Sequence, residues 1–216
     1  MFNPSLFEKI IHKIISKTTP FFAPIRKKFL KRTDFTIISN NCWGGVCYQY
    51  FGLPKQSPTV GTFFMASDFI SFVSNLEYYL SKEIHFIDAE KSKHLIFLRE
   101  RNIDCPIGVL DDVEVFFLHY PNEFIAKEKW NRRIKRVNRD NLIFKFSQMN
   151  DCTLQDLKTF DELDLPGKKM MFVNKPNMGY KCGVYYPGYE QESTIENDTF
   201  FWNKYLNVVE FLNKEV

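Results

Sequence analysis

The sequence lacks the features that mark membrane-spanning, secreted and disulfide-stabilised proteins. No apolar run approaches the roughly 20 residues of a membrane-spanning helix, and the N-terminus has no apolar segment followed by a small-residue cleavage site. There are five cysteines, an odd number without a CxxC pair, and four scattered histidines. This pattern predicts neither a disulfide framework nor a metal site, and we expect a cytoplasmic protein.

The apolar content suffices for one core. The 216 residues are 44% hydrophobic and 17% aromatic, and the 23 Phe and 10 Tyr are spread along the chain, which favours a packed domain over disorder. At this length one generous core is expected rather than two. We predict a basic helical arm over residues 1–33 and a single α/β domain over residues 34–216.

The first 32 residues are strongly basic. They hold eight Lys or Arg residues against Glu8 alone, a charge of +7, which leaves −4 for the rest of a chain whose total is +3. Apolar residues recur at helical spacing from Leu6 to Ile15, and we expect Pro20 and Pro24 to end this helix. Two interpretations are open. Residues 1–32 contact anionic lipid at the inner face of the plasma membrane, or the helix packs on the body or on a second subunit.

Beyond the arm, strand-like and helix-like segments alternate. Strands are predicted at 35–38, 84–87, 95–99, 113–119, 142–146 and 169–173, with 105–109 as connecting structure or an edge strand. Helices are predicted at 46–51, 68–82, 122–137, 154–163 and 200–212, and residues 174–189 form a long irregular connection. This order predicts an α/β fold of three layers, a mainly parallel sheet flanked by helices, with a ligand crevice at the carboxyl ends of the strands.

The first core strand runs into a turn that opens a helix, made of Asn40, Asn41, Cys42, Trp43, Gly44 and Gly45. N–H groups at a helix N-terminus lower the pKa of a thiol, which favours a nucleophilic thiolate at Cys42. The same groups, with the amide of Asn40 or Asn41, could hold an oxyanion, and the glycines would let a substrate approach the backbone. Alternatively, Cys42 is a small buried residue and the glycines only turn the chain.

His119 ends the predicted strand 113–119, so we expect it at the same sheet edge as Cys42, where it could act as a general base toward a thiol or a sugar hydroxyl. A histidine held by a hydrogen bond in a loop is the alternative. Thr59 lies in the nearby loop 57–61, whose proline gives a stiff entry and whose glycine a flexible exit.

Basic residues are dense on the predicted helix 122–137. Arg132 and Arg136 are four apart and share a face, and Arg133 lies beside them; guanidinium groups of this kind grip phosphate or carboxylate at two points. A nucleotide, a pyrophosphate or an anionic sugar is therefore the expected ligand, and a solvated charged face is the alternative. Nucleic acid is not expected, because the body carries −4 and shows no motif that reads DNA or RNA. The polar cluster also includes Trp130, Asn138 and Asn141.

Taken in order, these segments resemble an uncharacterised bacterial family labelled exopolysaccharide biosynthesis proteins. The resemblance covers about residues 35–173 and is carried by residues 38–45, 57–61, 68–70, 75–76, 119–120, 130–138 and 141–142. It implies a task in the synthesis of capsule, exopolysaccharide or cell-wall glycan. The turn at Cys42 is also similar to the Gly-Asn-Cys turn of thiol-dependent capsule acetyltransferases, although Asn40 replaces that glycine and Trp43 follows the cysteine.

From the residues and the resemblance together we expect an acyltransferase that acts on a glycan or lipid-linked sugar, with Cys42 as nucleophile and His119 as base. Acetyl-coenzyme A is the expected donor, with no tightly bound cofactor and no metal. The expected substrate-binding residues are Asn40, Asn41, Trp43, Gly44, Gly45, Thr59, Trp130, Arg132, Arg133, Arg136, Asn138 and Asn141. One alternative is a glycosyl- or phosphosugar-transferase with a nucleotide-sugar donor and a structural Cys42. Another is a non-catalytic factor that brings glycan enzymes to the membrane.

Overall fold

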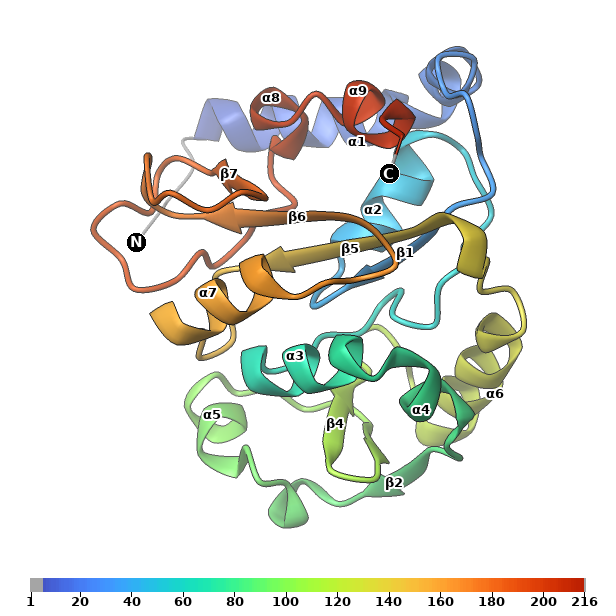
Figure 1. Ribbon diagram of the computed structural model, residues 1–216, viewed down its shortest axis with the longest axis vertical. Coiled ribbons are helices and arrows are strands. Elements are labelled where there is room, and N and C mark those ends of the chain that lie inside the picture. Colours follow the sequence, from blue (N-terminus) through green and yellow to red (C-terminus); the bar gives the residue numbers. More distant parts are fainter. Residues whose placement is uncertain (1–5, 216) are drawn as a thin grey trace.

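The computed structural model describes residues 6–215 and is built around a parallel sheet (Figure 1). Four strands lie in the order β1–β5–β6–β7, and each neighbouring pair is parallel. Three of them were predicted, whereas β7 lies inside the connection that was expected to be irregular. The strands are β1 (Thr36–Ser39), β5 (Leu142–Ser147), β6 (Gly167–Val173) and β7 (Gly183–Tyr185).

Helices cover both faces of this sheet, which confirms the prediction of three layers. Alternate residues of β5 point to opposite faces, so that Phe144 packs with Phe69 and Phe160 on one side while Ile143 packs with Trp43 and other aromatic residues on the other. The helices of the body are α2 (Trp43–Tyr50), α3 (Ala66–Ser74), α4 (Leu76–Ser81), α6 (Glu123–Ile134), α7 (Leu154–Glu162), α8 (Trp202–Tyr205) and α9 (Val208–Asn213).

Two helices differ from their predicted lengths because the chain changes direction within them. The predicted helix 68–82 is divided into α3 and α4 at Asn75, whose φ of −133° is not helical. The predicted helix 200–212 is divided into α8 and α9 in the same way, with Leu206 extended between them.

A second sheet, antiparallel and with the order β2–β3–β4, packs beside α3 and α4 (Figure 1). Its strands are β2 (His85–Ile87), β3 (Ile107–Leu110) and β4 (Val113–Phe116). The strand predicted at 95–99 is wrong, because these residues form α5 (Leu95–Glu100). A short apolar run does not distinguish a strand from a helix, and here one helical face is covered while Ile96 remains 74% exposed.

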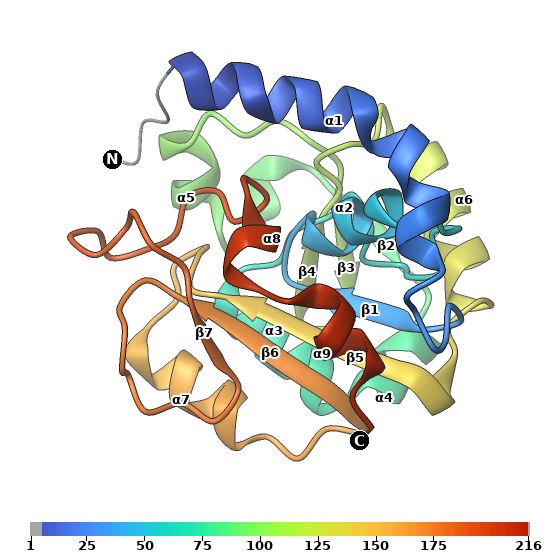
Figure 2. The same cartoon turned by 90° about the horizontal axis from the view of Figure 1, so that it is seen from above.

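Among its described residues the basic arm forms one long helix, α1 (Leu6–Lys27), which contains both prolines, so the prediction that they end the helix is wrong. Its axis bends in the half where they lie (Figure 2), as expected where a proline removes a backbone hydrogen bond. This half packs on α2: Ala23 is buried, and the Arg26 guanidinium lies 4.0 Å from the centre of the Tyr50 ring. Within residues 6–215, no helix, α1 included, has both the length and the apolar character to cross a bilayer.

Candidate functional site

Cys42 stands where β1 gives way to α2. It is the residue that caps the N-terminus of α2, its side chain is partly exposed, and its thiol donates a weak hydrogen bond to the Thr62 carbonyl oxygen over 3.9 Å. Burial raises the pKa of the Cys42 thiol to about 11, the charge of Asp198 adds to this effect and that of Lys145 opposes it. The predicted lowering of this pKa is therefore wrong: desolvation of the thiol is the largest effect, and the resting thiol is protonated.

Two pockets meet at Cys42 and His119, which line both. The first, which we call the asparagine pocket, has a volume of about 380 Å³, and its wall includes Asn41, Asn150, Asn197 and Thr199. The second, which we call the basic pocket, has a volume of about 370 Å³, and its wall includes Gly45, Lys55, Lys129 and Arg133. The cysteine and the histidine thus lie at the boundary between an amide-rich and a cationic compartment.

His119 reaches this boundary from the turn after β4, three residues beyond the end of that strand. Its backbone N–H donates to the Gly61 carbonyl oxygen over 3.2 Å. The carbonyl oxygen of the next residue, Thr62, accepts the hydrogen bond from the Cys42 thiol. Gly61 has a φ of +80°, and a Cβ atom there would lie 3.1 Å from the Tyr120 ring, so this position requires glycine. The His119 side chain is exposed and makes no hydrogen bond with any described residue, which leaves the imidazole available to a substrate.

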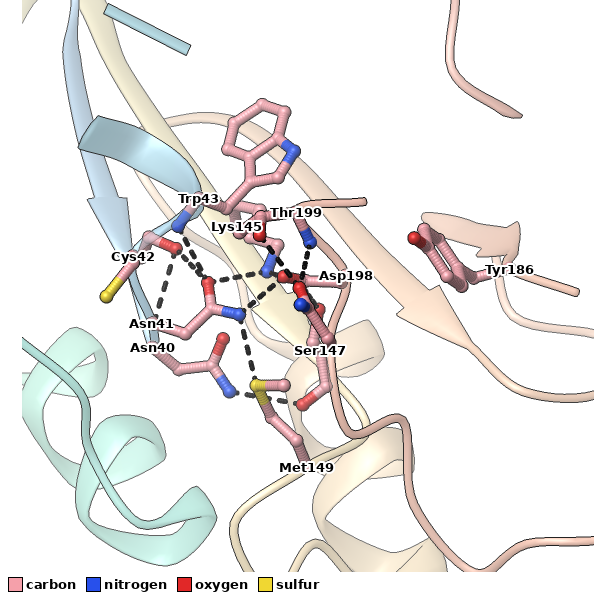
Figure 3. Close-up of polar contacts among 12 residues, drawn as sticks. Asn40, Asn41, Cys42, Trp43, Lys145, Ser147, Met149, Tyr186, Asp198 and Thr199 are labelled. Atoms are coloured by element: carbon pink, nitrogen blue, oxygen red, sulfur yellow. Dashed lines mark hydrogen bonds and ion pairs between the residues drawn. The ribbon is translucent and has the colours of Figure 1, made fainter. Parts of the chain in front are cut away.

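A buried polar network lies on the other side of the cysteine turn (Figure 3). Lys145 and Asp198 are both 0% exposed and form an ion pair. Asn41 joins them, since its Oδ1 accepts from Lys145 Nζ over 2.9 Å and its Nδ2 donates to Asp198 Oδ1 over 2.7 Å. Ser147 Oγ donates to the same carboxylate, and Asn41 Oδ1 also accepts from the backbone N–H of Trp43 over 3.1 Å. The network fixes the start of α2 to β5 and to the loop that carries Asp198.

These contacts engage the side-chain amides that were expected to hold an oxyanion. Asn40 Nδ2 donates to the Ser147 carbonyl oxygen over 3.1 Å, and Asn41 Nδ2 is shared between Asp198 and Met149. The Nδ2 donors of both side chains are thus directed to protein partners, whereas the buried Asn40 Oδ1 has no partner among the described residues. The Trp43 N–H is bonded to Asn41 Oδ1, so the donors that remain near the cysteine turn are the backbone N–H groups of Gly44 and Gly45 in the first turn of α2, which have no partner inside the helix.

The structure brings one of the three predicted arginines to the site. Arg133 is buried, lines the basic pocket and donates to the Val60 carbonyl oxygen over 2.9 Å and to the Tyr120 hydroxyl. Arg132 and Arg136 are exposed and line neither pocket, and Arg132 pairs with Glu128 over 2.9 Å. The shared face of Arg132 and Arg136 is thus the solvated one.

The other predicted binding residues have structural roles. Trp43 and Trp130 are fully buried in the two cores on either side of the parallel sheet, and Gly44 packs closely against Ile37. Thr59 is buried, and its Oγ1 accepts from the Ser39 N–H over 3.1 Å.

Two further residues that were predicted to bind a substrate lie at the end of the parallel sheet opposite the cysteine turn. Asn138 and Asn141 both hydrogen-bond to Asp34 near the amino end of β5, opposite the cysteine turn. Among the described residues, no group of three or more His, Cys, Asp or Glu side chains could hold a metal ion.

Comparison with known proteins gives a family rather than an activity. A family model described as Domain of unknown function (DUF1919) matches residues 11–213. A protein of Haemophilus influenzae (strain ATCC 51907 / DSM 11121 / KW20 / Rd), named Uncharacterized protein, is 29% identical over 214 residues, which are 97% of this chain and 97% of the relative. The matched range includes most of α1, so the similarity extends beyond the segment 35–173 that carries the motifs.

Proposed function

We propose that this chain, which belongs to the DUF1919 family, is an acyltransferase of bacterial surface-polysaccharide synthesis, because it places a cysteine and a histidine at the boundary of two pockets. The pathway rests on the motif resemblance over residues 35–173. The chemistry rests on one observation, the presence of Cys42 and His119 in the walls of both pockets. A donor in one pocket and an acceptor in the other would each have access to the same sulfur.

The reaction has two half-steps. In the first, His119 takes the Cys42 thiol proton while the sulfur attacks the thioester carbonyl of acetyl-coenzyme A; the carbon–sulfur bond to coenzyme A breaks, and the departing thiolate takes the proton from the imidazolium. In the second, a sugar hydroxyl gives its proton to His119 and its oxygen attacks the acetyl carbon. The bond to Cys42 then breaks, and its sulfur recovers the proton.

Because the pKa of Cys42 is about 11, the proposed reaction needs a general base, and this is the role that we assign to His119. A thiol that is protonated at neutral pH cannot attack without losing its proton, so a base must take that proton in the transition state. General-base catalysis of this kind contributes roughly 10²- to 10⁴-fold in rate.

The asparagine pocket suits a sugar acceptor. Amide groups both donate and accept hydrogen bonds and can thus satisfy the hydroxyls of a sugar ring. Asn150 and Asn197 supply amides, and Thr199 supplies a hydroxyl that donates to Asn197 Oδ1 over 2.7 Å. Phe63 and Leu118 add apolar surface to the same wall. The wall therefore offers polar partners for the hydroxyl groups of a pyranose ring and apolar surface for its C–H groups.

Intact-mass analysis after incubation with acetyl-coenzyme A tests the proposal. We expect one acetyl group on the wild type, none on Cys42→Ala, and slower labelling of His119→Gln by about 10²-fold or more. Cys105→Ala is the matched control, because burial raises the pKa of Cys105 to about 11 as well, yet Cys105 lines neither pocket. An unmodified wild type, or equal labelling of Cys42 and Cys105, would contradict the proposal.

The second candidate is a glycosyl- or phosphosugar-transferase with a nucleotide-sugar donor. The observation that favours it is the cationic wall of the basic pocket, which suits a diphosphate group, while a Cys42 thiol that burial keeps protonated is compatible with a structural role. Release of nucleotide from a nucleotide sugar, equal for the wild type and Cys42→Ala, would support this candidate over the first.

We also propose that the protein works at the inner face of the plasma membrane, held there by α1. Ile10, Ile14, Phe21 and Ile25 are exposed and lie within an arc of about 60° at roughly 100° per residue. The buried Ala23 lies on the opposite side, against the body. An apolar stripe that faces away from the body, on a basic helix, is typical of a helix that lies in an anionic lipid interface.

A further inference from the structure

The basic pocket has a wall of one charge sign. Lys55, Lys129 and Arg133 line it, and no described carboxylate does. The three cations come from different places, Lys55 from the loop after α2 and the other two from α6 at a spacing of four residues, which puts them on one helix face. Separate segments therefore contribute cationic residues to the same wall, and the Lys129 Nζ also lies 3.9 Å from Glu128 Oε2, outside the wall.

Arg133 is the most informative of these residues because it is buried without a counter-ion. It is 8% exposed, and its Nη1 donates only to uncharged oxygens, those of Val60 and Tyr120. No described carboxylate lies within salt-bridge distance of it, whereas the exposed Arg132 and Arg139 each pair with a glutamate. A buried charge is normally compensated, so the missing negative charge is expected to come from a ligand.

The backbone at the rim of this pocket also favours an anion. Cys42 and Gly45, at the cap and in the first turn of the eight-residue helix α2, both line the wall. The Trp43 N–H of this turn donates to Asn41 Oδ1, but the N–H groups of Gly44 and Gly45 have no partner inside the helix and lie at the positive end of its dipole. Gly45 has no side chain that would keep a ligand from them.

We infer that the basic pocket binds the phosphate or diphosphate group of a substrate, with Arg133, Lys55 and Lys129 as the cationic contacts. The inference rests on the proposed function in one respect, since it makes this pocket the place where a charged substrate is held next to Cys42. The volume of about 370 Å³ lies within the roughly 300–1,000 Å³ of small-molecule sites.

The remainder of such a substrate has a path toward α1. A neighbouring pocket of about 700 Å³ is lined by Pro20, Ala23 and Pro24 of α1, and it shares Gln49 and Lys55 with the basic pocket. A phosphate in the basic pocket could therefore belong to a water-soluble nucleotide or coenzyme A, or to a lipid-linked sugar whose carrier leaves along α1. Phosphate recognition is common to both sources, and the test below separates them.

Titration of the full-length protein with inorganic diphosphate at about 0.15 M salt, a concentration that screens exposed charges, measures the site. We expect saturable binding that weakens at least about tenfold in the double variant Lys55→Gln/Lys129→Gln, as the loss of charge-assisted contacts predicts. The matched control is Arg132→Gln/Arg136→Gln, which removes the same charge from the outer face of α6 and should change the affinity less than about twofold. Absence of binding to the wild type, or equal weakening in both doubles, would overturn the inference.

Competition identifies the source of the phosphate. Displacement of diphosphate by coenzyme A or a nucleotide sugar supports a soluble substrate. Displacement by vesicles that contain a polyprenyl diphosphate, but not by vesicles of phosphatidylglycerol alone, supports a lipid-linked one. Displacement by none of these contradicts a substrate site.

Cys42→Ala keeps this test separate from the proposed reaction. The variant should bind diphosphate like the wild type, because its thiol is not among the proposed contacts. Normal binding with no acetyl-enzyme in the wild type would reject the acyltransferase alone, and acetyl-enzyme without diphosphate binding would reject the phosphate site alone.

Discussion

Cys42 and His119 line the same two pockets although they follow strands of different sheets, β1 of the parallel sheet and β4 of the antiparallel one. The segment 61–64 joins them. Its Phe63 forms an isolated bridge with Phe116 at the end of β4, and the Phe64 N–H donates to the Asn40 carbonyl oxygen over 3.0 Å. The catalytic geometry proposed for this protein thus depends on the contact between the two sheets, and changes within this segment should alter it.

Gly61→Ala should both destabilise the protein and slow acetylation of Cys42. A left-handed residue other than glycine costs about 1–2 kcal/mol, and crowding of Tyr120 at 3.1 Å adds roughly 1–3 kcal/mol. Gly179→Ala is the matched control, because its φ is +77° but nothing lies within 4 Å of the added Cβ. Urea unfolding should show the larger loss of free energy for Gly61→Ala. Equal losses in the two variants would show that the contact with Tyr120 is not tight.

Alkylation of Cys42 should depend steeply on pH. Because burial raises the pKa of this thiol to about 11, the thiolate fraction and hence the rate with iodoacetamide should rise about tenfold per pH unit from pH 7 to pH 10, without a plateau. Peptide mass spectrometry separates Cys42 from the other cysteines, and Cys105 serves as an internal reference with a similar pKa. A plateau below pH 9 would indicate a preformed thiolate and a different resting state.

Removal of either partner of the buried ion pair should be costly. Lys145→Met leaves Asp198 without its cation, and Asp198→Asn leaves Lys145 without its anion, so each should reduce the free energy of unfolding by about 3–5 kcal/mol. In the double variant no unpaired charge remains, and the loss should be smaller than the sum of the two single losses. Denaturant unfolding of all four proteins gives this coupling energy, and strictly additive losses would mean that the two charges do not compensate each other.

Three of the four strands of the parallel sheet could be predicted from the sequence because they are short apolar runs between helical patterns, as at 142–146 and 169–173, whereas the three-residue β7 lies in a segment without such a run. The position of α5 could not, since four apolar residues in a row fit a strand and a helix equally well. The same limit applies to α1, where proline gives a probable boundary but a surface helix can continue with a bend.

The site was predictable in part. Sequence order placed Cys42 at the end of a strand, and the structure puts His119 beside the same pockets. Three arginines of α6 and its C-terminal turn were predicted to bind a ligand because basic residues are dense there. Only the buried one, Arg133, lines the basic pocket. Nothing in the local sequence around Lys55 and Lys129 predicts a binding role. Tertiary packing decides which surface lysines lie close together. Lys145 did carry one, as a charged residue inside an otherwise apolar strand implies a buried partner.

Membrane attachment through α1 gives the last prediction. Phe21→Ser should reduce co-sedimentation of the protein with vesicles that contain phosphatidylglycerol, because it removes the most exposed apolar side chain of the stripe. Phe124→Ser on α6 is the matched control: Phe124 is 78% exposed and Phe21 79%, so the two changes remove nearly the same exposed apolar surface at different places.

The charges of α1 provide an independent variable for the same measurement. Lys13 and Lys17 are exposed beside the stripe, and replacement of both by Gln should weaken binding to anionic vesicles by roughly 2 kcal/mol, at about 1 kcal/mol for each charge, with little effect on neutral vesicles. Raising the salt concentration should reduce the difference, since screening acts on the charges and not on the apolar stripe. If Phe21→Ser and Phe124→Ser weaken binding equally, the attraction is a general property of the surface. If neither the wild type nor the variants bind vesicles, the exposed stripe of α1 is more consistent with contact to a second protein chain, because an apolar face of this kind is otherwise left in water.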